Sequence, residues 1–117
     1  MQAQLHSRIL LAVLIACLSL AAQGAAQHPL DALDAAEITA TMAILKSAGH
    51  ADDKTLVSSI SLQEPPKAEV LAWKTGDAIP RSAKAVLRRN ATTFEAVVDL
   101  GSGKVLSHKA IPGAQPF

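Results

Sequence analysis

The sequence predicts an α+β domain in which one helix packs on a four- to five-stranded antiparallel sheet. Three features indicate this class: one segment has helical periodicity and both end signals, short segments of alternating polarity follow it, and tight-turn sequences separate them. Sequential strands joined by short turns favour antiparallel pairing. A single helix then covers one face of the sheet, since each element must bury its apolar side.

The helix is expected over residues 34–48. Asp34 is placed to cap the free N–H groups of its first turn, and Glu37 is placed to reach back to the cap, as in a capping box. Gly49 follows the last helical residue, where a left-handed conformation ends many helices. The positions expected to form its apolar face, at helical spacing, are Ile38, Met42 and Leu45.

The remainder of the chain is expected to form strands, because apolar and polar residues alternate along it. Turn signals containing Pro, Gly or Asn separate these segments. The turn signals are Pro65-Pro66, Thr75-Gly76-Asp77, Arg89-Asn90 and Gly101-Ser102-Gly103. The expected strands cover residues 56–63, 68–73, 83–88, 94–100 and 105–109.

The first 26 residues have the pattern of a secretory signal peptide. Arg8 precedes an apolar run from Ile9 to Leu20, and small residues then continue to Ala26. This run is short for a membrane span, which needs about 20 residues. The sequence therefore predicts an exported protein, periplasmic or secreted, with a signal peptide at 1–26, one domain at 27–112 and a linker or truncated tail at 113–117.

Cys17 is the only cysteine. Leu14-Ile15-Ala16-Cys17 is similar to a bacterial lipobox, so lipidation of Cys17 is an alternative to cleavage after Ala26. Cleavage after Ala26 would leave a mature chain without cysteine, and therefore without a disulfide, a thiol nucleophile or a Cys metal ligand.

The charge balance argues against nucleic acid as a partner. Of the 11 Lys and Arg residues only Arg8 lies in the leader, so the rest balance the 10 Asp and Glu residues. Nucleic-acid-binding domains carry a basic excess. We expect no nucleic-acid partner, and no membrane contact beyond the signal peptide.

No metal-binding pattern is present outside the leader. His28, His50 and His108 have no second histidine at the spacing of a shared metal. His50 precedes Asp52 and Asp53, a weak cluster that we interpret as a solvated turn.

Motifs for nucleophilic catalysis and phosphate binding are missing as well. Gly101-Ser102-Gly103-Lys104 lacks the upstream glycine of a P-loop and is not a nucleophile elbow. Glu95 and Asp99 are expected on a solvated strand face. Asn90-Ala91-Thr92 fits the N-glycosylation triplet, which acts only in a eukaryotic secretory pathway. The sequence thus predicts no catalytic, cofactor-binding or metal residue, and it contains no tyrosine.

Several stretches, taken together and in order, resemble the start of the mature chain in bacterial copper amine oxidases. They cover about residues 28 to 112. The stretches are His28-Pro29-Leu30-Asp31, Ala35-Ala36-Glu37-Ile38, Ala48-Gly49-His50, Leu62-Gln63-Glu64-Pro65-Pro66-Lys67, Val70-Leu71-Ala72-Trp73, Ile79-Pro80-Arg81 and Glu95-Ala96-Val97-Val98-Asp99-Leu100.

The resemblance implies a small N-terminal domain of cystatin-like shape from a long homodimeric chain. Enzymes of this family oxidise primary amines with O2 and water to aldehydes, ammonia and H2O2. They use copper and topaquinone, a quinone formed from a tyrosine of the same chain. No position of this chain matches the family's copper histidines, cofactor tyrosine or catalytic aspartate. We therefore expect a fragment or truncated gene product that lacks the catalytic domain, binds no cofactor and is inactive alone.

A second interpretation is a stand-alone exported binding or inhibitory module. Residues 97–105 are similar to the strand-turn-strand of PepSY-type domains. An accessory domain separated from its partner is expected to expose an apolar patch, around Trp73, Leu71 and Ile79, that a stand-alone module would lack.

Overall fold

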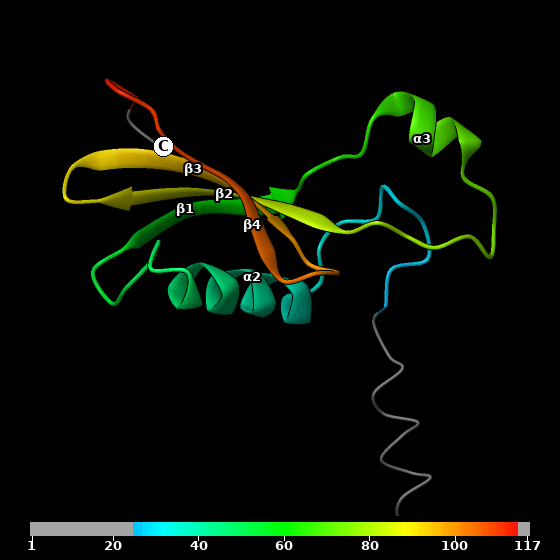
Figure 1. Cartoon of the computed structure of the whole chain (residues 1–117), viewed down its shortest axis with the longest axis horizontal. Coiled ribbons are helices and arrows are strands. Elements are labelled where there is room, and N and C mark those ends of the chain that lie inside the picture. Colours follow the sequence, from blue (N-terminus) through cyan, green and yellow to red (C-terminus); the bar gives the residue numbers. More distant parts are fainter. Residues whose placement is uncertain (1–24, 115–117) are drawn as a thin grey trace, which may run out of the picture.

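The computed structural model describes residues 25–114 and has the expected α+β architecture, with one main helix packed on a four-stranded antiparallel sheet (Figure 1). Apart from Ala25 and Ala26, the predicted signal peptide lies outside the described residues, as do Cys17 and residues 115–117. The elements are α2 (Ala35–Ser47), β1 (Leu56–Leu62), α3 (Lys67–Ala72), β2 (Ser82–Arg89), β3 (Thr92–Asp99) and β4 (Lys104–Ala110).

The sheet is a simple meander in the order β1-β2-β3-β4, with every neighbouring pair antiparallel. β1 and β4 are therefore the edge strands, and each carries an irregularity in its register. Ser58 is the extra residue in β1, and Leu106 is the extra residue in β4. Bulges on edge strands hinder pairing with a second chain. The bulge also explains why Leu106 is 61% exposed.

Helix α2 begins and ends as its sequence predicts. The Asp34 carboxylate accepts from the Glu37 N–H at 2.8 Å, and the Glu37 carboxylate accepts from the Asp34 N–H at 3.0 Å, which completes the capping box. Gly49 has a φ of 79°, and the His50 N–H donates to the Leu45 carbonyl at 2.9 Å. This Schellman arrangement satisfies carbonyls of the last turn.

The face that α2 buries differs in part from the expected one. Leu45 is fully buried and Met42 packs against the core, but Ile38 is 38% exposed. Thr41 is buried in its place, and its hydroxyl donates to the Glu37 carbonyl at 2.8 Å. A buried hydroxyl with this local acceptor costs little, so the helix accepts a polar residue against the sheet.

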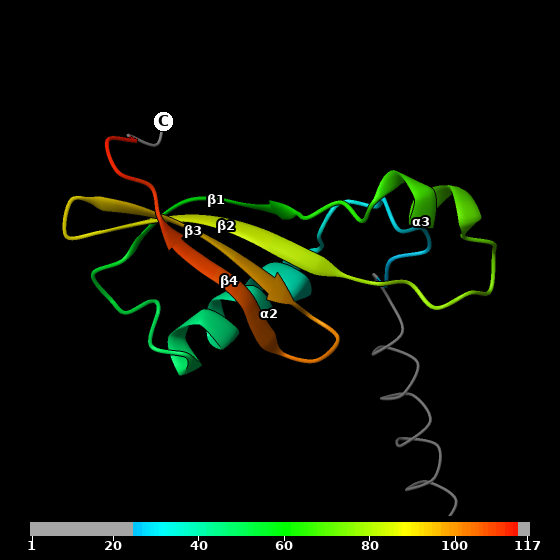
Figure 2. The same ribbon diagram turned by 45° about the horizontal axis from the view of Figure 1, so that its top comes forward.

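Helix α2 lies along one face of the sheet in both views (Figures 1 and 2), and the core residues come from the helix, the loop after it and the central strands. Most of its members are small or branched aliphatic residues, which agrees with the scarcity of aromatic residues in the sequence. Alanines on the central strands leave room for α2 to lie close to the sheet. The buried core residues are Leu45, Ala51, Ala83, Ala85, Leu87, Ala96 and Val98.

The strand expected over residues 68–73 is wrong, because this segment is the helix α3. Its alternation of apolar and polar residues depends on alanine, which is a weak strand former and the best helix former. Pro66 lies at its N-cap, just before the first turn, where a fixed φ of −53° suits a helix start. The sheet consequently has four strands, the lower of the two expected numbers.

Residues 63–81, which we call the arm, connect β1 to β2 and contain α3. The arm extends away from the sheet in both views (Figures 1 and 2). Helix α3 has no buried residue, and Leu71 is 74% exposed. No helix within residues 25–114 is long and apolar enough to cross a membrane.

The hairpin between β2 and β3 turns one residue later than expected. Its central residues are Asn90 and Ala91, with φ values of 51° and 63°. Two positive φ values are what a two-residue hairpin requires to match the twist of its strands. Asn adopts positive φ values readily. Alanine rarely does, so Ala91 did not indicate a turn in the sequence.

Candidate functional site

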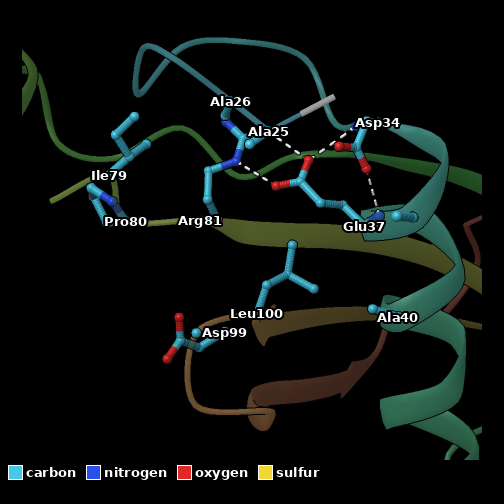
Figure 3. Close-up of a pocket in the computed structure, with 12 residues that line it drawn as sticks. Ala25, Ala26, Asp34, Glu37, Ala40, Ile79, Pro80, Arg81, Asp99 and Leu100 are labelled. Carbon is cyan, nitrogen blue, oxygen red and sulfur yellow. Dashed lines mark hydrogen bonds and ion pairs between the residues drawn. The ribbon is translucent and has the colours of Figure 1, made fainter. Parts of the chain in front are cut away.

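A largely apolar groove lies where the start of α2, the end of the arm and the β3–β4 turn come together. Its volume is about 540 Å³ (Figure 3). The groove is lined chiefly by small and aliphatic residues, with a few charged groups at its edge. These residues are Ala25, Ala26, Asp34, Ala36, Glu37, Ala40, Ile79, Pro80, Arg81, Asp99, Leu100 and Gly101.

Arg81 is the only cation among the groove residues, and its guanidinium is turned toward Glu37 (Figure 3). Its Nε donates to Glu37 Oε1 at 2.7 Å, and its Nη2 donates to Glu37 Oε2 at 2.8 Å. The remaining donors reach the carbonyls of Asp31 at 2.7 Å and Ala32 at 3.1 Å. The bidentate pair with Glu37 and the two carbonyls occupy most of the guanidinium N–H groups, so Arg81 has few donors left to bind an anion.

The Glu37 carboxylate is likewise occupied by hydrogen bonds within the domain. Its carboxylate accepts from Arg81 and from the Asp34 N–H, and the side chains of Arg81 and Glu37 are 10% and 20% exposed. The hydrogen bond from Arg81 lowers the pKa of Glu37, although burial opposes this shift. The carboxylate is therefore ionised at neutral pH and is unsuited to act as a general acid.

The acidic residue on the opposite edge of the groove also has a local role. Asp99 accepts from the Ser102 hydroxyl at 2.5 Å and from the Ser102 N–H at 3.2 Å, and these bonds lower its pKa. The segment Gly101-Ser102-Gly103 is thus a hairpin turn, as expected. The groove offers shape and apolar surface, but it contains no nucleophile paired with a base.

The three histidines outside the leader are placed in two separate regions. The His28 ring meets Trp73 edge to face, with 5.0 Å between ring centroids. His50 and His108 lie at the other end of the domain and stack face to face, with 3.9 Å between centroids. Sequence spacing did not predict this pair, because its members come from a loop and from β4.

The weak acidic cluster next to His50 does not form a ligand set. Asp52 pairs with Arg89 at 2.7 Å, and Asp53 is exposed. Across residues 25–114, no group of three or more His, Cys, Asp or Glu side chains is placed to hold a metal ion. The chain also has no tyrosine. The described residues therefore do not fit a copper centre, and the sequence has no precursor for a tyrosine-derived quinone.

The remaining residues that the sequence analysis named take part in contacts within the domain or lie on its surface. Glu95 forms a surface ion pair with Lys84 at 3.3 Å. Of the three residues of the expected apolar patch, Leu71 is exposed, whereas Trp73 and Ile79 are half-buried. Sequence reasoning missed the role of Arg81, whose partners are at least 44 positions away along the chain.

Comparison with known proteins assigns the family. The family model described as "Copper amine oxidase, N2 domain" matches residues 28–111. The chain belongs to this family. The match covers the helix, the arm and all four strands, and it confirms the resemblance that the sequence motifs indicated.

The curated relatives are much longer than this chain. A primary amine oxidase of Klebsiella aerogenes is 42% identical over 90 residues, which is 74% of this chain and 12% of the relative. A primary amine oxidase of Arthrobacter sp. (strain P1) is 44% identical over 86 residues, 72% of this chain and 13% of that protein. The copper-containing amine oxidase gamma 2 of Arabidopsis thaliana is 36% identical over 88 residues, 73% of this chain and 13% of its own length.

Proposed function

We propose that this chain is a non-catalytic accessory domain of a copper amine oxidase. The observation that carries the proposal is the match to the N2 domain over residues 28–111, with relatives of which the chain covers only 12% to 13%. The charged groups of the groove add support, because the capping box, the Arg81 pair and the β3–β4 turn occupy them.

In this proposal the chemistry belongs to a separate catalytic domain. That domain would carry copper and topaquinone, form the homodimer and oxidise a primary amine to an aldehyde, ammonia and H2O2. The accessory domain would pack against it and supply no reacting group. Leu71 and Leu106 are two of the exposed leucines that could contribute to such packing.

A chimera tests the accessory role directly. Residues 28–111 replace the matched segment of the Klebsiella aerogenes amine oxidase, and H2O2 release from a primary amine is measured with copper present. We expect the chimera to fold and remain active, because the two segments are 42% identical over 90 residues. A deletion of the same segment is the matched control. A chimera as defective as the deletion contradicts the proposal and favours the stand-alone binding module.

The non-catalytic part of the proposal has its own test. The chain alone is incubated with Cu²⁺ and a primary amine, and H2O2 is measured. We expect no release above the copper blank, because the sequence offers no tyrosine for a quinone and the described residues offer no ligand set. Amine-dependent H2O2 production by the purified chain would overturn it.

We further propose that the chain is exported, with residues 1–26 removed as a signal peptide. N-terminal sequencing of the mature protein tests this. A start at Gln27 supports the proposal, and a start at a lipid-modified Cys17 would replace it with membrane anchoring through the lipid. A retained Met1 would contradict cleavage altogether.

A further inference from the structure

Three flat rings stack on one another beside the C-terminal end of α2. His108 of β4 is the middle ring. The His50 ring lies on one side of it, with centroids 3.9 Å apart and planes 16° apart. The Phe94 ring of β3 also stacks on it, with centroids 4.9 Å apart and planes 12° apart. His50 belongs to residues 48–55, the loop that joins α2 to β1.

This loop has few other attachments to the sheet. Arg89 Nη2 pairs with Asp52 Oδ2 at 2.7 Å, and Arg89 Nη1 donates to the Gly49 carbonyl at 3.3 Å. The His50 N–H is bonded to the helix itself, through the Leu45 carbonyl. The loop is therefore attached to the sheet by one ion pair, one weak hydrogen bond and the ring stack, together with the buried Ala51.

We propose that the His50–His108 stack is a pH-sensitive latch, which holds residues 48–55 against β4 while the His108 ring is neutral and releases them when that ring is protonated. Neutral aromatic rings attract each other when stacked. A positive charge on His108 is unfavourable in this half-buried stack, because burial removes water from the cation and Arg89 repels it. This inference goes beyond the accessory role and does not depend on it.

Two neighbouring groups act on the His108 ring, His50 of the loop and Arg89 of β2, and both disfavour its protonated form. The loop contributes His50 and Asp52, and β2 contributes Arg89, whose cation disfavours a second positive charge nearby. From β3 the ring that stacks on His108 is that of Phe94, which is uncharged. Lys109, next to His108 in β4, lies opposite Glu95 in the register and so on the other face of the sheet.

The direction of the pH effect follows from His108. Burial, then His50, then Arg89 lower the pKa of His108 below its usual 6.5. The closed form therefore binds fewer protons than an open form in which the imidazole is solvated. The linkage relation then makes the closed form stable above about pH 6.5 and progressively less stable below it.

Asp52 keeps the other attachment intact over this range. A hydrogen bond from the Lys54 N–H lowers the pKa of Asp52, with a further contribution from Arg89. Its carboxylate stays ionised while His108 becomes charged, so the Arg89–Asp52 pair opposes opening. Replacing Asp52 by Asn removes that opposition, and we expect the loop to open at a higher pH in this variant.

Hydrogen–deuterium exchange of the full chain tests the latch. Exchange of residues 48–55 is measured near pH 7.5 and pH 5.5 and corrected for the intrinsic effect of pH. We expect the corrected opening equilibrium to rise at the lower pH by at most about tenfold, the limit for charging one group whose pKa in the open form is the ordinary 6.5. His108→Phe keeps a flat ring that cannot be protonated, so its loop should stay closed at both pH values.

His28→Phe is the matched control, because His28 meets Trp73 edge to face in the other region, so its replacement should leave the pH response unchanged. Equal loop exchange at both pH values in the parent, with His108 protonated by NMR, would overturn the latch. A pH response in His108→Phe as large as in the parent would also overturn it. If His108→Phe fails to fold, the pKa of His108 is measured by NMR in the parent and in His50→Phe. The proposal requires a higher pKa of His108 in His50→Phe. An unchanged pKa would refute the interaction between the two rings.

Discussion

The helix-covered sheet and the arm of residues 63–81 hold their shapes by different means. In the sheet region, Leu45, Leu87 and Val98 are completely enclosed between α2 and the central strands. In the arm, α3 buries no side chain and Leu71 is 74% exposed. The first region is thus held by a core, whereas the second is held by its two ends, its prolines and one aromatic contact. Substitutions of the same chemical kind should have very different effects in the two regions.

The largest expected effect is that of Leu45→Ala. Leu45 is 0% exposed, and its removal leaves a cavity between α2 and the sheet. Such truncations lower the free energy of unfolding by about 2–5 kcal/mol. A domain of this size has little stability to lose, so the variant should be largely unfolded at modest urea concentrations. Urea unfolding followed by circular dichroism measures the difference.

Leu71→Ala is the matched control in the arm, because it deletes the same atoms from an exposed site. We expect its free energy of unfolding to change by less than about 0.5 kcal/mol. Similar losses in the two variants would show that the arm is packed as tightly as the core, and the contrast between the regions would fail.

The next effect concerns the joint between the two regions. Arg81 ends the arm and ties it to α2 through Glu37 and to the N-terminal segment through the carbonyls of Asp31 and Ala32. Arg81→Met keeps the aliphatic stem but leaves these acceptors without their donor. Loss of hydrogen bonds to a charged group costs about 1.5–3 kcal/mol, which is the expected fall in the free energy of unfolding.

The Arg81 variant should also change the pH dependence of stability. Because Arg81 lowers the pKa of Glu37 below its ordinary 4.5, the pair contributes stability above that pH and loses it as pH falls through the lowered pKa. The parent should therefore lose stability on acidification below about pH 4.5, and Arg81→Met should lose less over the same range. Parallel pH curves for the two proteins would contradict the assigned role.

Short-range patterns in the sequence were sufficient to predict the ends of α2 and most of the strands. The capping box of Asp34 and Glu37 and the left-handed Gly49 fixed both ends of α2, and four of the five expected strands are present. The strand predicted over residues 68–73 is wrong, because a six-residue alternation that includes alanine is compatible with a helix as well as with a strand. The family assignment also came from the sequence, through several short stretches in a constant order.

The groove and the ring stack could not be predicted in the same way. Arg81 meets Glu37 only after the strands have paired, and nothing near Arg81 in the sequence marks its partner. His50 and His108 come together across the end of the sheet, from a loop and an edge strand. Contacts between residues so distant in sequence depend on strand register, which the bulges in β1 and β4 shift by one residue.

A smaller effect than at Leu45 or Arg81 is expected at Trp73, which lies within the arm. The indole ring meets His28 edge to face, and its Nε1 is buried without a hydrogen-bond partner among the described residues. An unsatisfied buried donor costs about 1–3 kcal/mol. Trp73→Phe removes that donor and keeps an aromatic ring. Removal of the donor's desolvation cost therefore offsets much of the stability lost with the smaller contact area.

We expect the free energy of unfolding of Trp73→Phe to lie within about 1 kcal/mol of the parent, since the donor penalty and the lost contact area are of similar size. Circular dichroism must follow the unfolding, because the variant has no tryptophan fluorescence. Trp73→Ala is the control, since it removes the ring contact to His28 as well as the donor and should be less stable than Trp73→Phe. A loss in Trp73→Phe as large as in Leu45→Ala would mean that the Nε1 is satisfied and that Trp73 anchors the arm as firmly as a core residue anchors the sheet.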